Sequence, residues 1–120
     1  AVLASLYKAP RDRDLLISEL KNYIECYITD DSLSPRTLAR AFEISTRYAH
    51  KLFELDGCTI GEWILRRRLE RSTDDLTRGD WSITDIAFKW GFKDLGHYSR
   101  SFKRYYGKTP SAYRREATVA

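Results

Sequence analysis

The sequence has few cysteines and histidines, no methionine and no long apolar run. Each of these shortages excludes some classes of protein. Among 120 residues there are no methionines, two cysteines and two histidines. No apolar run approaches the roughly 20 residues that cross a bilayer, so we expect no membrane segment and a cytoplasmic location. Cys26 and Cys58 lack CxxC spacing, and no Cys/His cluster surrounds them. We expect two reduced thiols, with a disulfide or redox pair as the alternative, and no metal or cofactor.

The sequence also lacks the patterns of an enzyme. It has no nucleophile–base pattern and no phosphate loop, and the acids at positions 74, 75, 80 and 85 form no pair suited to catalysis. We therefore expect no enzymatic activity. The chain does not start with methionine, and residues 1–11 show no periodicity. We expect those residues to be a tail or interdomain linker of a fragment whose partner domain lies upstream.

Positive charge is abundant in one place. The formal net charge is +4 and the pI about 9.1. Residues 89–108 contain six Lys or Arg and one acid, whereas the other hundred residues contain 15 bases and 16 acids. Nearly all the excess charge therefore lies in one segment, which favours nucleic acid as a partner.

One segment occurs twice, with an offset that grows from 48 to 50 residues. The matched pairs are Leu38-Ala39 with Ile86-Ala87, Phe42-Glu43-Ile44 with Trp90-Gly91-Phe92, Phe53 with Phe102, Gly57 with Gly107, and Trp63 with Tyr113. A repeat near 50 residues is usually one supersecondary unit used more than once. This unit has the pattern helix, tight turn, helix, which is typical of proteins that bind DNA.

Helix signals predict an all-α fold with seven helices, and no segment of useful length has the period of a strand. The first helix begins near Asp12 or Asp14 and ends by Thr29. The others cover about 34–42, 45–56, 59–78, 82–90 and 94–106, followed by a short one from Thr109. Caps at Ser34, Ser45 and Ser82, and a capping box of Thr59 with Glu62, support these starts.

These helices predict a domain over residues 12–116 with two helix-turn-helix subdomains, at about 34–56 and 82–106. A long linker helix at 59–78 joins them, and residues 117–120 are expected to be a frayed tail. The linker of 20 residues is about 30 Å long, close to the roughly 34 Å between recognition helices one DNA turn apart. Gly91 suits a left-handed turn in the second unit, whereas the first unit has Glu43 there.

In each unit the second helix has a free polar face. Helix 45–56 buries Ala49, Leu52 and Phe53, whereas helix 94–106 buries Tyr98, Phe102 and Tyr105. The outward residues are Arg47, His50, Lys51 and Glu54 in the first helix, and Gly96, His97, Arg100, Lys103 and Arg104 in the second. A major groove admits one α-helix, and Arg or Lys can pair with guanine edges there. An ordinary solvated face is the alternative for either helix alone.

Individual residues have alternatives of their own. Arg100 could instead pair with Asp94 or a backbone carbonyl, and His50 and His97 are interpreted as occupying matching repeat positions. The expected phosphate contacts are Arg40, Lys89, Lys103 and Arg104, with Ser34, Ser45, Ser82 and Thr84 at helix starts, where simple capping is the alternative. The run Arg66–Arg68 is expected to pair with Glu62, Glu70 or Asp74. The aromatics Trp63, Trp81, Trp90, Tyr98 and Tyr113 are expected in or near the core.

The second repeat resembles the signature of the AraC/XylS family of bacterial transcription regulators. The residues that carry the resemblance are Ile86-Ala87, Gly91-Phe92, Tyr98-Ser99-Arg100, Phe102-Lys103, Gly107, Pro110 and Tyr113-Arg114. Leu38-Ala39, Ser45, Leu52-Phe53, Gly57 and Arg68-Leu69 resemble the first half of the same domain more loosely. The match covers roughly residues 14–116.

The resemblance implies a regulator, usually an activator, that binds promoter DNA and contacts RNA polymerase, with a separate effector or dimerisation domain. It implies base-reading roles for Arg47, His50, Lys51, Gly96, His97 and Arg100. The chain departs from the family at Ala49, at Ser72, where Ala is usual, and at Leu95-Gly96, so the second recognition helix is expected to read fewer bases. A protein–protein module, or the DNA-targeting part of a repair methyltransferase, is the alternative function.

Overall fold

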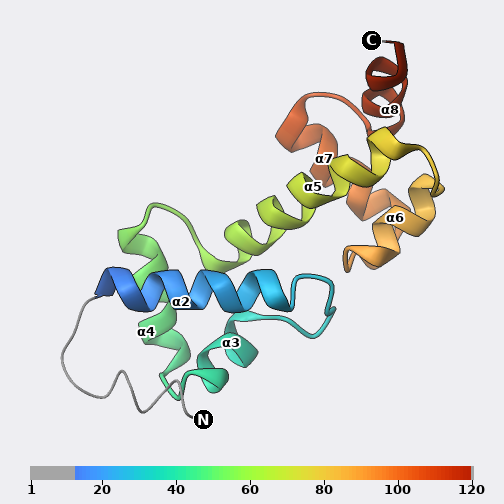
Figure 1. Cartoon of the computed structure of the whole chain (residues 1–120). Coiled ribbons are helices and arrows are strands. Elements are labelled where there is room, and N and C mark those ends of the chain that lie inside the picture. The colour runs from blue at the N-terminus through green and yellow to red at the C-terminus, as the bar shows by residue number, and fades with distance from the viewer. Residues whose placement is uncertain (1–12, 120) are drawn as a thin grey trace. The chain divides into compact units, whose positions relative to one another are not determined.

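A computed structural model describes residues 13–119, with side chains up to Ala117, and helices joined by turns and loops make up this part of the chain (Figure 1). Its seven helices are α2 (Arg13–Cys26), α3 (Pro35–Ala41), α4 (Thr46–Leu55), α5 (Ile60–Arg78), α6 (Ile83–Lys89), α7 (Leu95–Tyr106) and α8 (Pro110–Val119). The predicted all-α class is confirmed. The tail expected at 1–11 lies outside the described residues. The tail expected at 117–120 is helical as far as Val119, because α8 continues beyond the short helix that the sequence predicted.

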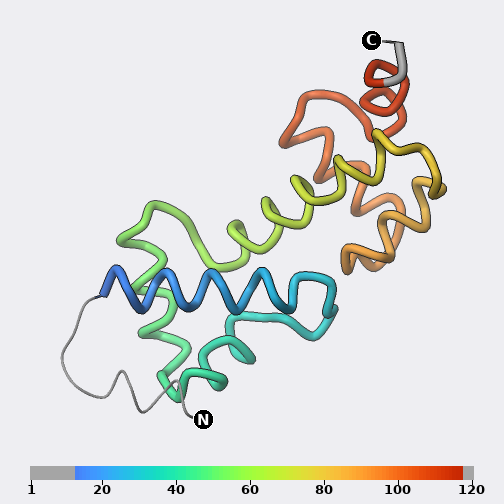
Figure 2. The backbone as a smooth tube through the Cα atoms, in the orientation of Figure 1, coloured from blue at the N-terminus to red at the C-terminus, as the bar shows by residue number. Residues whose placement is uncertain are grey.

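The chain forms two compact units. The described part of the first contains residues 13–28 and 32–64, and that of the second contains residues 29–31 and 65–119. In the first unit, α2 contacts both α3 and α4, and α3 contacts α4; in the second, α7 contacts α6 and α8. The helix pairs α3/α4 and α6/α7 are each joined by a short turn (Figure 2).

The first unit has an apolar core that follows from helical spacing. Leu20 and Ile24 of α2 are fully buried, as are Leu38 of α3 and both Leu52 and Phe53 of α4. The pattern also placed Tyr27 on this stripe, but Tyr27 is 47% exposed because α2 ends at Cys26, one residue earlier.

The second unit has a core rich in aromatic rings. The Tyr98 ring packs against Phe92 and Phe102, with centroids 5.0 and 5.7 Å apart. Two of the aromatics predicted for the interior lie at the surface, since Trp81 is 46% and Tyr105 is 44% exposed. Tyr105 donates its hydroxyl hydrogen to Glu70 at 3.1 Å, so a helical stripe alone did not separate buried rings from half-exposed ones.

Candidate nucleic-acid interface

The turn of each helix pair adopts the left-handed backbone conformation. Gly91 has φ 86°, and Glu43 has φ 54° at the corresponding place in the first unit. A non-glycine residue is uncommon there, so the two turns share one geometry although only one has the residue that favours it.

Arg68 covers the turn of the second unit. A Cβ at Gly91 would lie 3.0 Å from Arg68 Cζ, and the Arg68 guanidinium donates to the Asp30 carbonyl at 2.8 Å. Burial lowers the pKa of Arg68, although the charges of Asp30 and Asp31 act in the opposite direction. Within the run expected to pair with acids, Arg67 does so with Glu70 at 2.7 Å.

The face that α4 presents follows from its cap and its buried residues. Ser45 precedes the helix, and its side chain accepts the Tyr48 N–H at 3.0 Å. Ala49, Leu52 and Phe53 are fully buried. The opposite side is exposed and lines an open depression, and its residues are Arg47, His50, Lys51 and Glu54. The four residues predicted to point outward from this helix are therefore exposed. Their role in reading bases stays a prediction.

The face of α7 is built in the same way. Asp94 is the N-cap and accepts the His97 N–H at 2.7 Å, and Gly107 ends the helix with φ 81°. The helix buries Tyr98, Ser101 and Phe102. The residues exposed on its other side include His97, Arg100, Lys103 and Arg104, whereas Gly96 is half-buried.

The caps and buried residues give the register between the two helices. Ser45 and Asp94 are 49 residues apart, and so are Ala49 and Tyr98. At this offset His97 corresponds to Tyr48, so the interpretation that His50 and His97 match is wrong.

The same offset pairs Lys51 with Arg100 and Arg47 with Gly96. Two further exposed residues of these helices are not among the site residues predicted from the sequence. Tyr48 and Leu95 lie in the first helical turns and are each 40% exposed. Tyr48 lies three residues after the cap Ser45 and Leu95 one residue after the cap Asp94, and these places next to the caps were the signal that could have found them.

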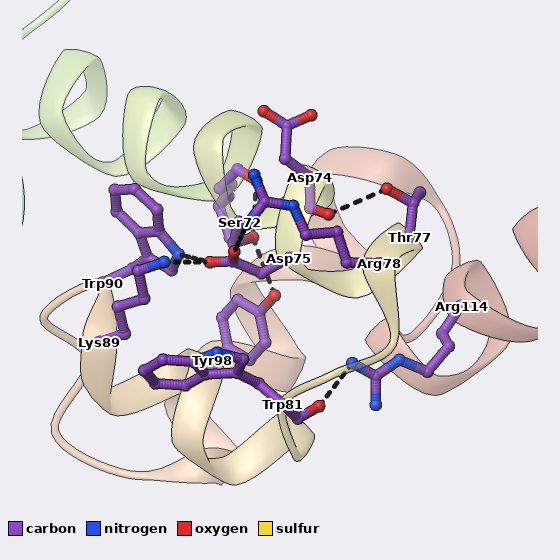
Figure 3. A network of polar contacts seen from close by, with 11 residues as sticks. Ser72, Asp74, Asp75, Thr77, Arg78, Trp81, Lys89, Trp90, Tyr98 and Arg114 are labelled. Carbon is purple, nitrogen blue, oxygen red and sulfur yellow. Dashed lines mark hydrogen bonds and ion pairs between the residues drawn. The ribbon is translucent and has the colours of Figure 1, made fainter.

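Buried polar contacts hold α6 and α7 against α5 (Figure 3). Tyr98 donates its hydroxyl hydrogen to Ser72 Oγ at 2.8 Å, and both residues are fully buried. Asp75 accepts the Trp90 indole N–H at 2.8 Å and pairs with the Lys89 ammonium at 2.9 Å. Ser72, which lies on α5, is thus a hydrogen-bond partner of α7.

These contacts shift the ionisation of both buried groups. Burial alone would raise the pKa of Asp75, but the hydrogen bonds from Lys89 and Trp90 and the charges of Lys89 and Arg78 outweigh burial and hold that pKa below its ordinary 3.8. Burial raises the pKa of Tyr98 to about 12, although the hydrogen bond to Ser72 acts in the opposite direction. Asp75 is therefore an anion that neutralises Lys89, and Tyr98 a neutral donor, at physiological pH.

Some of the residues expected to contact phosphates already have partners within the protein, and others do not. Ser34, Ser45 and Ser82 cap their helices, each accepting one backbone N–H. Lys89 is bound to Asp75 and lies 5.1 Å from the centroid of the Trp90 ring. The remaining candidates are exposed, and they are Arg40, Thr84, Lys103 and Arg104. Within residues 13–117, Arg100 makes no ion pair with Asp94.

Two other features bear on the class of protein, a metal site and a membrane-spanning helix. The described residues contain no group of three or more His, Cys, Asp or Glu side chains that could hold a metal ion. No helix among them is long and apolar enough to cross a membrane.

Two helix-turn-helix units, each with an exposed polar second helix, define the class of double helix-turn-helix proteins. The helix-turn-helix domain family matches residues 33–116. The transcriptional activator NphR of Rhodococcus is 33% identical over 100 residues, which make up 83% of this chain. The chain therefore belongs to the AraC/XylS-type family of helix-turn-helix transcription regulators.

Solved structures share the fold. The C-terminal domain of the two-component response regulator yesN from Fusobacterium nucleatum matches 82% of this chain and 97% of its own, with a TM-score of 0.78 and 27% identity. The DNA-binding domain of AdpA, a global transcriptional factor solved in complex with a target DNA, covers 85% of this chain and 92% of its own, with a TM-score of 0.78 and 22% identity. The chain spans about a third of the length of several relatives, among them NphR at 30%.

Proposed function

We propose that this chain binds duplex promoter DNA sequence-specifically and inserts α4 and α7 into successive major grooves. The observation that carries the proposal is the shared register of the two helices, which presents cationic side chains at the same place in both. Lys51 and Arg100 correspond to each other in this register. Arginine can make two parallel hydrogen bonds to guanine, and lysine can donate to the same edge.

The remaining roles follow from exposure and chemistry. We assign base contacts to Arg47, His50, Lys51, His97 and Arg100, with Gly96 close to the bases. Tyr48 and Leu95 join this set as apolar contacts for thymine methyl groups. Arg40, Lys103, Arg104, Thr84 and the capping serines Ser34, Ser45 and Ser82 are assigned to phosphates, which set register without reading sequence. Lys89 is left out because Asp75 already neutralises it.

The proposal also covers the place of this domain in a longer regulator. We assign residues 12–116 to the DNA-binding domain of a bacterial transcription activator that works in the cytoplasm and contacts RNA polymerase. An N-terminal effector or dimerisation domain would account for the additional length of relatives such as NphR. The linker α5 has 19 residues and is about 28 Å long, which suits two readers one DNA turn apart.

Selection from a random duplex library, followed by footprinting of the selected sites at two salt concentrations, tests the proposal. Two protected major-groove segments about one turn apart are expected, with Arg47→Ala weakening one and Arg100→Ala the other. Arg13→Ala is the matched control, because Arg13 is an exposed cation on α2 with no ion pair among the described residues. Selection of no consensus at low salt would refute sequence-specific binding and favour a protein–protein module.

A further inference from the structure

The space above Gly96 is occupied by another residue of the same helix. Gly96 is the second residue of α7, and a Cβ built on it would lie 2.9 Å from Arg100 Nη1. Real Cβ atoms essentially never approach another heavy atom so closely. Side chains on a helix slope toward its N-terminus, which is why the residue four positions later covers this one. The Arg100 guanidinium thus lies where a side chain at position 96 would be.

A carboxylate flanks the same point. Asp94 Oδ1 would lie 3.3 Å from that Cβ, and the same oxygen accepts the His97 N–H at 2.7 Å. The cap therefore fixes the carboxylate near the same point as the guanidinium, although Asp94 and Arg100 form no ion pair. Arg100 consequently lies over the first turn of α7, the part of a recognition helix that meets base edges.

We propose that Gly96 is a positioning residue for Arg100: because position 96 has no side chain, the guanidinium lies across the first turn of α7 in the place from which it reads a guanine. This inference rests on the proposed DNA-binding function. In this inference Gly96 does not contact a base itself but positions Arg100, which does. The planar guanidinium loses less freedom on pairing when its position is set beforehand.

The first unit does not have this arrangement. In the shared register, Arg47 stands where α7 has Gly96, and Lys51 stands where it has Arg100. Position 47 carries a long cation where α7 has a glycine, so α4 has two cations at these two positions and α7 has a single arginine. We therefore expect the α7 segment of the DNA site to depend on one guanine more sharply than the α4 segment does.

A double-mutant cycle tests the inference, with binding measured by competition between the selected duplex and duplexes changed at the guanine that Arg100→Ala identifies. Arg100→Ala should reduce discrimination at that base pair by roughly 5- to 150-fold, the range of a bidentate arginine–guanine pair. Gly96→Ala should lose part of the same discrimination, because the flexible end of the Arg100 side chain must shift away from the new Cβ. The double variant should discriminate no less than Arg100→Ala alone, because Gly96 acts through Arg100.

Stability and a matched glycine separate this role from a structural one. Gly96→Ala should melt at or above the wild-type temperature, since alanine favours a helix more than glycine. Gly61→Ala is the control, because Gly61 is also the second residue of its helix and a Cβ there would meet only Thr59 Oγ1, at 4.0 Å. It should leave discrimination unchanged.

Three results would overturn the inference. If Arg100→Ala behaves as expected while Gly96→Ala discriminates like the wild type, the positioning role fails and the proposed function stands. If Gly96→Ala weakens binding equally with and without Arg100, glycine serves close approach of the backbone to DNA instead. If the wild-type chain selects no duplex, the proposed function fails and the inference fails with it.

Discussion

Removal of the hydroxyl of Ser72 should destabilise the second unit. Ser72 Oγ donates to the Leu69 carbonyl at 2.7 Å and accepts from the Tyr98 hydroxyl at 2.8 Å, in a fully buried place. Ser72→Ala therefore leaves a buried phenol without its acceptor, which costs about 1–3 kcal/mol. Alanine has a higher helix propensity than serine, which offsets roughly 0.5 kcal/mol of this cost. We expect a net loss of about 0.5–2.5 kcal/mol in the free energy of unfolding.

The complementary change should cost less. Tyr98→Phe removes the donor, but Ser72 Oγ keeps the Leu69 carbonyl as its own acceptor. The loss is then that of one neutral hydrogen bond, about 0.5–1.5 kcal/mol. In the double variant neither group is left unsatisfied, so its loss should be smaller than the sum of the single losses by about 1 kcal/mol.

Urea unfolding followed by tryptophan fluorescence measures these differences, because two of the three tryptophans, Trp81 and Trp90, belong to the second unit. Thermal melting gives a second reading, because 1 kcal/mol shifts the midpoint of a small domain by about 4–8 °C. Thr77→Ala is the control, since Thr77 makes the same kind of bond to a carbonyl three residues earlier but is exposed. Strictly additive losses, or a Ser72→Ala variant as stable as the wild type, would refute the reasoning.

Three further changes should have measurable effects. Asp75→Asn should lower stability at pH 7 by about 1.5–3 kcal/mol, because hydrogen bonds to a charged group are lost. The folded pKa of Asp75 is lowered, so its contribution is full above 3.8 and disappears as the pH falls through the folded value. Urea midpoints measured from pH 7 to pH 2 should therefore converge for the two proteins. Gly91→Ala should cost more than about 1 kcal/mol in thermal unfolding, since φ is 86° and Arg68 Cζ lies 3.0 Å from the new Cβ. Lys103→Ala should weaken binding equally for all sequences and reduce the slope of log affinity against log salt by about 1, and a base-dependent loss would contradict a phosphate contact.

Much of the fold was predictable from sequence because the signals that set helix ends are local. Ser34 with Pro35 starts α3, and Thr59 with Glu62 forms the expected capping box of α5, with bonds of 2.8 and 3.0 Å. Such bonds join residues three apart, so the sequence shows both partners. The outward position of Arg47 and Arg100 follows equally from helical spacing.

What the sequence did not predict depends on residues far apart in the chain. Ser72 and Tyr98 are 26 residues apart, and their hydrogen bond exists only because α5 and α7 pack together. Trp81 was assigned to the core as a large aromatic residue and Tyr105 from its place on a helical stripe, yet packing leaves about half of each exposed. The match of His50 with His97 was wrong because it compared residue types instead of distances from the N-caps.

The charge that faces DNA is smaller than the sequence count suggests. Two of the six bases in residues 89–108 pair with acids outside that segment, Lys89 with Asp75 at 2.9 Å and Lys108 with Glu116 at 2.6 Å. The other four bases of residues 89–108 make no ion pair among the described residues, and they are Lys93, Arg100, Lys103 and Arg104.

If Arg100 reads a base, three of these cations remain for phosphates in the second unit. Each neutralised phosphate contributes about −0.9 to the salt slope of duplex binding, so the second unit should contribute roughly −3. A contribution near −5, as the sequence count alone implies, would require Lys89 and Lys108 to leave their acids on binding. Asp75→Asn separates the two cases: it frees Lys89 and should steepen the slope only if that ammonium is held by Asp75 in the wild-type complex.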